Sequence, residues 1–282
     1  MVKKFLCIFA LFVFVSLDVI AQKTDVKLAS INIRNDKKQD SINRWVNRRV
    51  LFFQFINQQK PDIFCLQEAV YKQLNDIRKN SDLYACIRDF KGRKWGSLNP
   101  IFYLKEKYNC IEKGVFSLSE SPDSIGSLGW DSLLPHTATW AKLKDKKSGK
   151  VFFVFNVHLD VRGKIAREKG MELVKDRIAI LTKDAPVILT GDMNSTKKSP
   201  VYQIATTKRR TMIDSYDIAT QKSGVSYTFH NFGKSPMKNR RKIDFIYVSD
   251  NVKVRKVDIP QEEPVHGVYL TDHNPVLVDI SF

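Results

Sequence analysis

The run Leu189-Thr190-Gly191-Asp192-Met193-Asn194 directly follows the apolar stretch Pro186 to Leu189. It places a carboxylate and a carboxamide two residues apart at the end of a strand-like segment. Asp192 can accept a proton from water, and Asn194 can donate hydrogen bonds to an anionic oxygen, while Gly191 permits a sharp backbone turn. Taken alone, the run also fits an Asx turn that closes a buried strand. Other segments that end in the same way therefore decide its meaning.

Several further strand-like segments carry polar groups of this kind. The segment 243–248 holds Asp244 among apolar residues. A buried carboxylate costs free energy unless it is paired, hydrogen-bonded or metal-bound, so Asp244 requires a partner, and two histidines lie at strand ends. The other segments are 26–33 with Asn32, 62–68 with Gln67 and Glu68, 151–157 followed by His158 and Asp160, and 276–280 preceded by Asp272 and His273.

The order of these motifs along the chain resembles that of the endonuclease/exonuclease/phosphatase superfamily, in its bacterial secreted-type, DNase I-like branch. The resemblance covers roughly residues 26–282, and the shared order of the motifs carries it, since no single motif is specific. It implies an α/β (α+β) fold, a DNase I-like four-layer sandwich of two packed mixed β-sheets with helices on the outside. Further resembling stretches are Asn99 to Tyr103, Leu118 to Asp123, Gly129 to Asp131, Thr139 to Ala141 and Thr228 to His230.

The resemblance also implies a divalent cation and the residues that hold it. Glu68 is the expected main ligand of Mg²⁺ or Mn²⁺, because a carboxylate is a hard oxygen donor. Asn32 and Asp272 are expected to complete or support this site. The cation would neutralise charge on the phosphate and orient it.

Hydrolysis itself is assigned to residues at the other strand ends. By resemblance, Asp192 orients or deprotonates the attacking water and Asn194 hydrogen-bonds the phosphate. His273, oriented by a neighbouring carboxylate, also contacts the phosphate. We expect His158, paired with Asp244, to stabilise or protonate the leaving group.

Substrate contacts are expected from two regions and from one departure in the motifs. The branch usually carries Arg ahead of the Thr-Trp-Ala segment, where this chain has His136. Because Arg offers a permanent charge and a two-pronged fork, we hypothesise that His136 weakens or pH-tunes a phosphate contact. The cationic cluster 238–242 directly precedes the Asp244 segment and is expected at the rim of the site. The full set of expected substrate contacts is Asn99, His136, His230, Lys238, Arg240 and Arg241.

Apolar spacing predicts the main helices and one hairpin. One helix is expected to bury Val46, Val50, Phe53 and Ile56, with Asp40 or Ser41 as its cap and Pro61 beyond its end. A second helix is expected to bury Met171, Val174, Ile178 and Leu181. The segments 137–143 and 151–157 flank a Ser-Gly turn and predict a hairpin.

The N-terminus predicts export. Residues 1–21 combine two lysines, an apolar run and a small-residue end near Ala21, which is typical of a signal peptide. We expect one mature domain, 22–282, located in the periplasm or outside the cell, without stable membrane insertion once the leader is removed. Cys65, Cys86 and Cys110 remain in this domain, an odd number that does not indicate a disulfide framework. No oligomeric state is assigned.

The formal net charge of +17 favours an anionic partner. The first functional hypothesis is a secreted metal-dependent phosphodiesterase or nuclease acting by water attack on phosphorus, with nucleic acid as a partner. The second is a phosphatase or headgroup phosphodiesterase on inositol phosphates, sugar phosphates or sphingolipids. A non-catalytic polyanion-binding protein is the third, and the complete set of expected hydrolytic residues argues against it.

Overall fold

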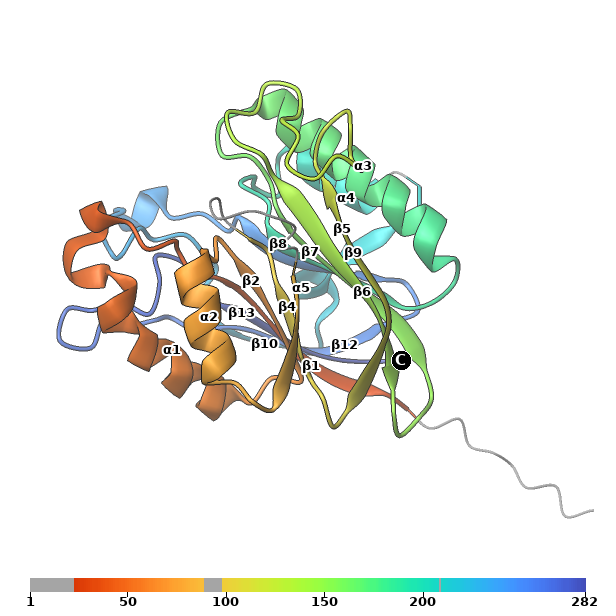
Figure 1. The fold of residues 1–282 in the computed structure, drawn as a ribbon, viewed down its shortest axis with the longest axis horizontal. Helices are drawn as coiled ribbons and strands as arrows, with labels where there is room; N and C mark the ends of the chain where they lie inside the picture. Colours follow the sequence, from red (N-terminus) through yellow and green to blue (C-terminus); the bar gives the residue numbers. More distant parts are fainter. Residues whose placement is uncertain (1–22, 89–97, 208) are drawn as a thin grey trace, which may run out of the picture.

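The computed structural model describes residues 23–88, 98–207 and 209–282 (Figure 1). The expected leader, 1–21, lies outside the described residues. One sheet has seven strands in the spatial order β10 (Gln221–Gly224), β12 (Lys253–Ile259), β13 (Val276–Ser281), β1 (Asp25–Asn32), β2 (Ile63–Gln67), β4 (Ile101–Leu104) and β3 (Tyr84–Ile87). The other has six, in the order β5 (Tyr108–Ser117), β6 (Thr137–Asp145), β7 (Val151–His158), β8 (Val187–Asp192), β11 (Asp244–Ser249) and β9 (Met212–Asp214).

The four longer helices lie on the outer faces of the two sheets, as Figure 1 shows. Apolar side chains of α1 and α2 share one buried cluster with the seven-stranded sheet, and those of α3 and α4 share another with the six-stranded sheet. The helices are α1 (Trp45–Gln59), α2 (Tyr71–Lys79), α3 (Lys164–Thr182), α4 (Pro200–Thr207) and α5 (Ser215–Ile218), with short 3-10 helices at η1 (Lys38–Asn43) and η2 (Met237–Asn239). The expected four-layer sandwich is confirmed.

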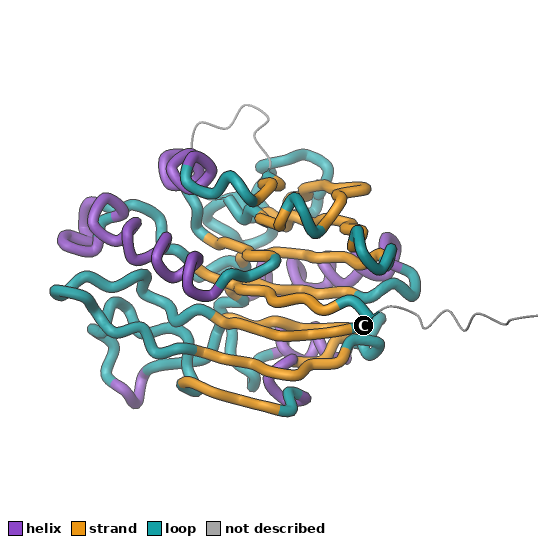
Figure 2. Tube along the Cα trace, turned by 90° about the horizontal axis from the view of Figure 1, so that it is seen from below, coloured by secondary structure: helices purple, strands orange, loops and turns teal. Residues whose placement is uncertain are grey.

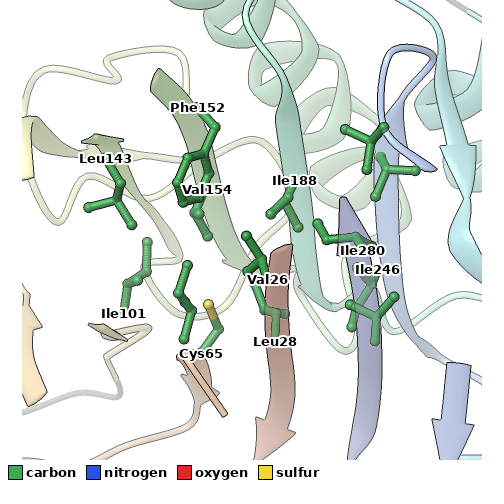
Figure 3. Close-up of a cluster of buried hydrophobic side chains, with 14 of the residues drawn as sticks. Val26, Leu28, Cys65, Ile101, Leu143, Phe152, Val154, Ile188, Ile246 and Ile280 are labelled. Atoms are coloured by element: carbon green, nitrogen blue, oxygen red, sulfur yellow. The ribbon is translucent and has the colours of Figure 1, made fainter. Parts of the chain in front are cut away.

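Alternation along the strands creates the central core. In β1, Leu28 contributes to the cluster between the sheets, whereas Ala29 contributes to the cluster beneath the helices. In β7, Val154 likewise contributes to the cluster between the sheets, and Phe155 to the cluster beneath the helices. Successive side chains point to opposite faces of a strand, so a strand with both faces covered is apolar throughout. Figure 2 shows the strands side by side, and Figure 3 shows the clustered side chains between the sheets.

The buried face of α1 differs from the predicted one. Val46 and Val50 are 59% and 54% exposed, and the side chains that α1 buries are Trp45, Arg48, Phe52, Phe55 and Ile56. Arg48 is fully buried because its guanidinium donates to backbone carbonyls, including those of Asn43 and Leu270. Ile56 is buried and Phe53 packs partly buried against the same cluster, so the predicted face is confirmed at these two residues and wrong at Val46 and Val50.

The expected cap of α1 was also wrong. Asp40 and Ser41 lie within η1, and the Asp36 carboxylate instead accepts a hydrogen bond from the Trp45 backbone amide at 3.1 Å. The second predicted helix is confirmed, since Met171, Val174 and Ile178 of α3 are buried and Leu181 packs partly buried against the same cluster. The 137–143 and 151–157 hairpin is confirmed as the antiparallel pair β6 and β7.

Strand direction brings the polar strand ends together. β1 and β2 run parallel and end at the paired residues Asn32 and Gln67. β7 and β8 run parallel and end at His158 opposite Asp192. β11 runs antiparallel to β8 and begins at Asp244, opposite Asp192. The ends of both sheets therefore meet at one edge of the sandwich. Among the described helices none has the length and apolar character needed to cross a membrane.

Candidate active site

Asp192 lies at the centre of this edge and is 2% exposed. Its Oδ1 accepts a hydrogen bond from the Asn194 backbone amide at 2.8 Å, which is the Asx turn that the sequence allowed. Its Oδ2 accepts from Nδ2 of Asn32 at 3.0 Å, so the carboxylate links the two sheets. Burial, and then the neighbouring Asp244, raises the pKa of Asp192 to about 7. A carboxyl group with this pKa can act as a proton acceptor near neutral pH.

Gly191 is required for a reason other than the expected turn. It lies within β8 between Val157 and Phe245, and a Cβ there would come 1.9 Å from the Val157 carbonyl oxygen. The backbone turns later, at Asn194, whose φ is +44°. Glu68 has a φ of +60°, so two site residues immediately beyond a strand adopt the left-handed conformation.

His158 faces Asn194 and Asp192 and does not form the predicted pair with Asp244. Asn194 donates through Nδ2 to the His158 Nε2 atom at 3.0 Å, and Nε2 lies 3.6 Å from Oδ2 of Asp192. Nε2 is therefore the acceptor, and the ring proton lies on Nδ1. Burial lowers the pKa of His158, so the ring is neutral at neutral pH. Its Nδ1 atom is buried without a hydrogen-bond partner in the described structure.

Asp244 instead pairs with His273. The Nδ1–H group of His273 donates to Oδ2 of Asp244 at 2.8 Å, and Nε2 of the same ring lies 3.9 Å from Oδ2 of Asp192. Burial opposes the charged ring, but Asp244, Asp272 and Asp192 outweigh it and raise the pKa of His273 to about 10. His273 is thus a buried imidazolium directed at Asp192. The expectation that a neighbouring carboxylate orients His273 is confirmed.

Glu68 is the ionised carboxylate of the site. Its Oε2 accepts from the Asn35 amide at 3.2 Å, and its Oε1 accepts from Asn32 at 3.3 Å. Burial raises its pKa, but His158, the Asn35 amide and Arg34 outweigh burial and lower it to about 2. Asn32 supports Glu68 as a donor, since its own Oδ1 accepts the Arg34 amide at 2.9 Å.

The charge of the site fits a divalent cation. Glu68 and Asp272 line the cavity, both are largely buried, and burial raises the pKa of Asp272. Oδ2 of Asp272 lies 3.7 Å from the nearest Arg34 nitrogen, which is too far for a strong hydrogen bond. The negative charges of these two neighbouring carboxylates are only partly neutralised by nearby cations. Their oxygens are therefore suitable ligands for a hard cation. Glu68 and Asp272 would hold it, and Asn32 would orient Glu68.

A second grouping is less suited to a metal. One ligand atom from each of Asp192, Asp244 and His273 lies within 4.8 Å of the others. A histidine must lose its ring proton to coordinate a metal through that nitrogen, whereas His273 gives one proton to Asp244 and has a pKa raised to about 10. Glu68 and Asp272 are therefore better suited than this grouping to hold a cation.

His136 lines the cavity, but protein atoms engage both of its ring nitrogens. Nδ1–H donates to the His158 carbonyl at 2.9 Å, and Nε2 lies 3.1 Å from Oδ2 of Asp160. Burial, and then His158, lowers the pKa of His136 to about 4, against the opposing effect of Asp160. The ring supports the strand end that carries His158. Its predicted contact with phosphate stays a prediction.

The hydrolytic residues surround one cavity of about 640 Å³. It is lined by Glu68, His136, His158, Asp192, Asn194, Asp272 and His273 from the expected set, and Asn32 and Asp244 bond directly to lining residues. Sequence reasoning missed several other lining residues. Among them are Arg34 and Arg162, which follow strand ends by a few residues, and the exposed Leu133, Leu134 and Val161. Phe229, from the resembling stretch Thr228 to His230, also lines the cavity.

The predicted cationic rim and two other expected contacts do not line this cavity. Arg240 lies over the Tyr227 ring, and Arg241 donates to the Lys238 carbonyl at 2.6 Å. Asn99 donates to the Thr137 carbonyl at 2.7 Å, and Nδ1 of His230 accepts the Gly233 amide. The backbone of Arg241 pairs with Phe229, which lines the cavity, but the arginine side chains of the cluster 238–242 turn onto Tyr227 and their own loop.

The sequence profile of the Endonuclease/Exonuclease/phosphatase family matches residues 29–273. The chain belongs to this family. It is similar to the crystal structure of an endonuclease/exonuclease/phosphatase from Bacteroides vulgatus, with 40% identity, a TM-score of 0.87 and coverage of 91% of this chain and 98% of that one. It is also similar to a mannosyl-6-phosphatase from Bacteroides thetaiotaomicron, with 32% identity, a TM-score of 0.84 and coverage of 91% and 100%.

A curated protein gives a shorter match. Nocturnin of Drosophila melanogaster is 26% identical over 171 residues, which are 56% of this chain and 25% of nocturnin. The chain thus matches about a quarter of that protein. Members of the endonuclease/exonuclease/phosphatase family are divalent-metal-dependent phosphoester hydrolases, and this chain, with its complete set of carboxylates and histidines, is an enzyme of that class.

The geometry shows what these side chains can do chemically. Asp192, whose pKa is raised to about 7, can accept a proton from water, and the adjacent His273 imidazolium can offer its Nε2–H to an anionic oxygen. The Asn194 side chain donates to His158 Nε2 and to the Leu159 carbonyl, and so holds the neutral His158 ring beside Asp192. A divalent cation supplies charge neutralisation on the phosphate when bound.

Proposed function

We propose that this protein is an exported, Mg²⁺-dependent phosphatase that hydrolyses small phosphomonoesters, with sugar phosphates as its substrate class. The observation that supports this proposal most directly is the cavity itself. It encloses Asp192 and His273, and its cations, such as Arg34 and Arg162, lie beside these groups. A cavity of about 640 Å³ is the size of a small-molecule site.

The walls of the cavity support the same substrate class. Leu133, Leu134 and Val161 are more than 60% exposed, and the centroids of the Phe229 and His273 rings lie 5.0 Å apart. Apolar and aromatic walls can pack against the carbon face of a sugar, while the phosphate lies among charged groups. The mannosyl-6-phosphatase, matched over its whole length at 32% identity, adds to this support.

A nuclease remains the second candidate because of the net charge of +17. The cluster 238–242, which favoured nucleic acid at the sequence level, has its arginines engaged with its own loop and with Tyr227. Export rests on the N-terminal residues 1–21, and Mg²⁺ rests on the oxygen donors Glu68 and Asp272.

The test is one incubation of the purified protein with Mg²⁺ and a mixed substrate panel. The panel holds mannose 6-phosphate, glucose 6-phosphate, inositol phosphates, single- and double-stranded DNA, and RNA, and Asp192→Ala serves as the blank. Mass spectrometry should find free sugar and phosphate with the nucleic acids intact. Shortened oligonucleotides with intact sugar phosphates would replace the proposal by the nuclease.

A further inference from the structure

One wall of the active-site cavity is built from two short segments that are distant in sequence. Residues 131–136 belong to the connection between β5 and β6, and residues 158–163 run from the end of β7 to the start of α3. Leu133 and Leu134 of the first segment line the cavity, as do His158 and Arg162 of the second. The connection that carries the leucines lies beside the beginning of α3 (Figure 1). The contacts that join the two segments therefore fix the shape of this wall.

Apolar burial does not hold this wall in place. Leu133, Leu134 and Val161 all line the cavity, and all are largely exposed. Side chains that stay exposed gain little of the free energy that burial gives. The anchors of the wall are therefore polar contacts.

Asp160 lies between the two segments and is almost fully buried. Its Oδ1 atom accepts hydrogen bonds from the backbone amides of Arg162, at 2.6 Å, and Gly163. Its Oδ2 atom faces the other segment, where it accepts from Oγ of Ser132 at 2.7 Å and lies 3.1 Å from Nε2 of His136. Burial raises the pKa of Asp160, but its hydrogen-bond partners outweigh burial and lower it, so the carboxylate is ionised at neutral pH.

The local alternative for Asp160 is an Asx turn that closes β7. Aspartate side chains commonly accept backbone amides that follow them closely in the chain, and Oδ1 of Asp160 does this. Such a turn accounts for Oδ1 alone. Oδ2 bonds Ser132, which is 28 residues earlier in the chain, and a turn does not require that contact. The role of Asp160 beyond the turn therefore rests on Oδ2.

A second carboxylate holds the same connection against α3. Asp131 accepts from the backbone amide of Ala166 at 2.6 Å and from that of Ile165 at 3.2 Å, and so caps the first turn of α3 from outside the helix. With Asp131 held on α3, the bond from Ser132 to Asp160 sets the direction in which the chain enters the two leucines.

We propose that Asp160 is a positioning residue that fixes this wall through Oδ2 and thereby sets the affinity of the site for the leaving group of the substrate. The inference rests on the proposed function, in which the phosphate lies among charged groups and the rest of the substrate packs against apolar side chains. Leu133 and Leu134 then contact the leaving group, whereas the phosphate lies near Asp192. Loss of the Oδ2 contacts should weaken binding of the whole substrate but not of inorganic phosphate.

The experiment is steady-state kinetics of the full protein with Mg²⁺ on the sugar phosphate that the panel identifies, with inhibition by inorganic phosphate measured alongside. Ser132→Ala removes the bond between Oδ2 and the leucine segment and leaves His136 in place, and Ser132→Thr keeps the hydroxyl. Asp160→Ser keeps an oxygen for the turn but has no second acceptor. The matched control is Ser223→Ala, because Oγ of Ser223 also bonds a carboxylate, that of Asp258 at 2.6 Å, and neither of these described residues lines the cavity.

We expect KM to rise about tenfold in Ser132→Ala, as loss of a hydrogen bond to a charged group implies, with kcat and the inhibition constant of phosphate within about twofold of the wild type. Ser132→Thr and Ser223→Ala should have the KM of the wild type. In Asp160→Ser, KM should rise at least as much and kcat should also fall, because His136 loses its partner and the strand end of His158 loses support.

Three results would overturn the proposal. They are a wild-type KM in Ser132→Ala, an equal rise of KM in Ser223→Ala, and an inhibition constant of phosphate that changes as much as KM does.

Amide hydrogen exchange of the metal-free protein separates this proposal from the phosphatase assignment. The amides of Leu118 and Ala166 donate to His136 and Asp131, so their exchange reports opening of the 131–136 segment. Exchange should be about tenfold faster in Ser132→Ala than in Ser223→Ala, at an unchanged unfolding temperature. If the panel shows a nuclease, equal exchange in the two variants overturns the positioning role and faster exchange in Ser132→Ala supports it. The two proposals therefore fail separately.

Discussion

The imidazole of His273 donates through Nδ1 to Oδ2 of Asp244 at 2.8 Å, and both side chains are almost fully buried. They come from different sheets, since Asp244 begins β11 and His273 precedes β13. The pair therefore fixes a positive charge beside Asp192 and fastens the two sheets at the catalytic edge.

Asp244→Asn should destabilise the protein in a pH-dependent way. The pKa of His273 is raised to about 10 in the folded state, against an ordinary value of 6.5. The stabilisation is fully present below pH 6.5 and is lost as the pH rises through 10, because only the charged ring gains from the carboxylate. We expect Asp244→Asn to cost about 1.5–3 kcal/mol at pH 6, and less at pH 10. Urea unfolding of metal-free protein measures this, and a pH-independent difference would contradict it.

Asp192 should control the pH dependence of turnover. Its raised pKa, about 7, means that the proton acceptor is available only as the pH rises. We expect kcat/KM to increase between pH 5 and 8, with a midpoint at or below 7, because a cation at Glu68 favours the carboxylate. Asp192→Asn should reduce kcat about 10³-fold and abolish the rise of kcat/KM with pH. A rate that declines across this range in the wild type would rule out the assigned role.

Glu68→Gln should weaken the response to metal. A neutral amide replaces the carboxylate whose pKa is lowered to about 2, so the Mg²⁺ concentration for half-maximal rate should rise about 10–100-fold. Glu106→Gln, which changes an exposed carboxylate elsewhere, is the control. Removal of metal by a chelator should abolish turnover of both. Identical metal titrations for the two variants would place the cation elsewhere.

Gly191→Ala should destabilise the fold where Gly170→Ala does not. A Cβ at Gly191 would lie 1.9 Å from a backbone oxygen of β7, and that strand cannot move without shifting His158. A Cβ at Gly170 would lie 3.5 Å from the nearest Leu159 atom and would favour the helix. We expect a loss of about 3 kcal/mol for Gly191→Ala and a small gain for Gly170→Ala. Thermal unfolding of both variants decides this.

The sequence predicted the strand ends well, for a physical reason. Strands covered on both faces are almost continuously apolar, so Asn32, Glu68 and Asp192 stood out as polar groups at their ends. The pairing of Asp244 could not be predicted in the same way. His158 and His273 both lie at strand ends, and only the packing of the two sheets decides which one reaches the carboxylate.

Other errors arose where a side chain acts against its usual preference. Arg48 is buried and Val46 is exposed, so the hydrophobic pattern of α1 was wrong in the first half of the helix. The cluster 238–242 was expected at the site because it is adjacent to Asp244, but a loop can turn its side chains onto itself. Arg34 was missed because its left-handed backbone, with φ of +53°, has no signal in the sequence.

The central claim is that water, activated by Asp192, attacks phosphorus within the cavity that holds Glu68 and His273. Hydrolysis of the substrate identified by the panel, carried out in oxygen-18 water, tests this most directly. Mass spectrometry of the products should find one labelled oxygen in the released phosphate and none in the alcohol. Label in the alcohol would show cleavage of the carbon–oxygen bond and would contradict the account.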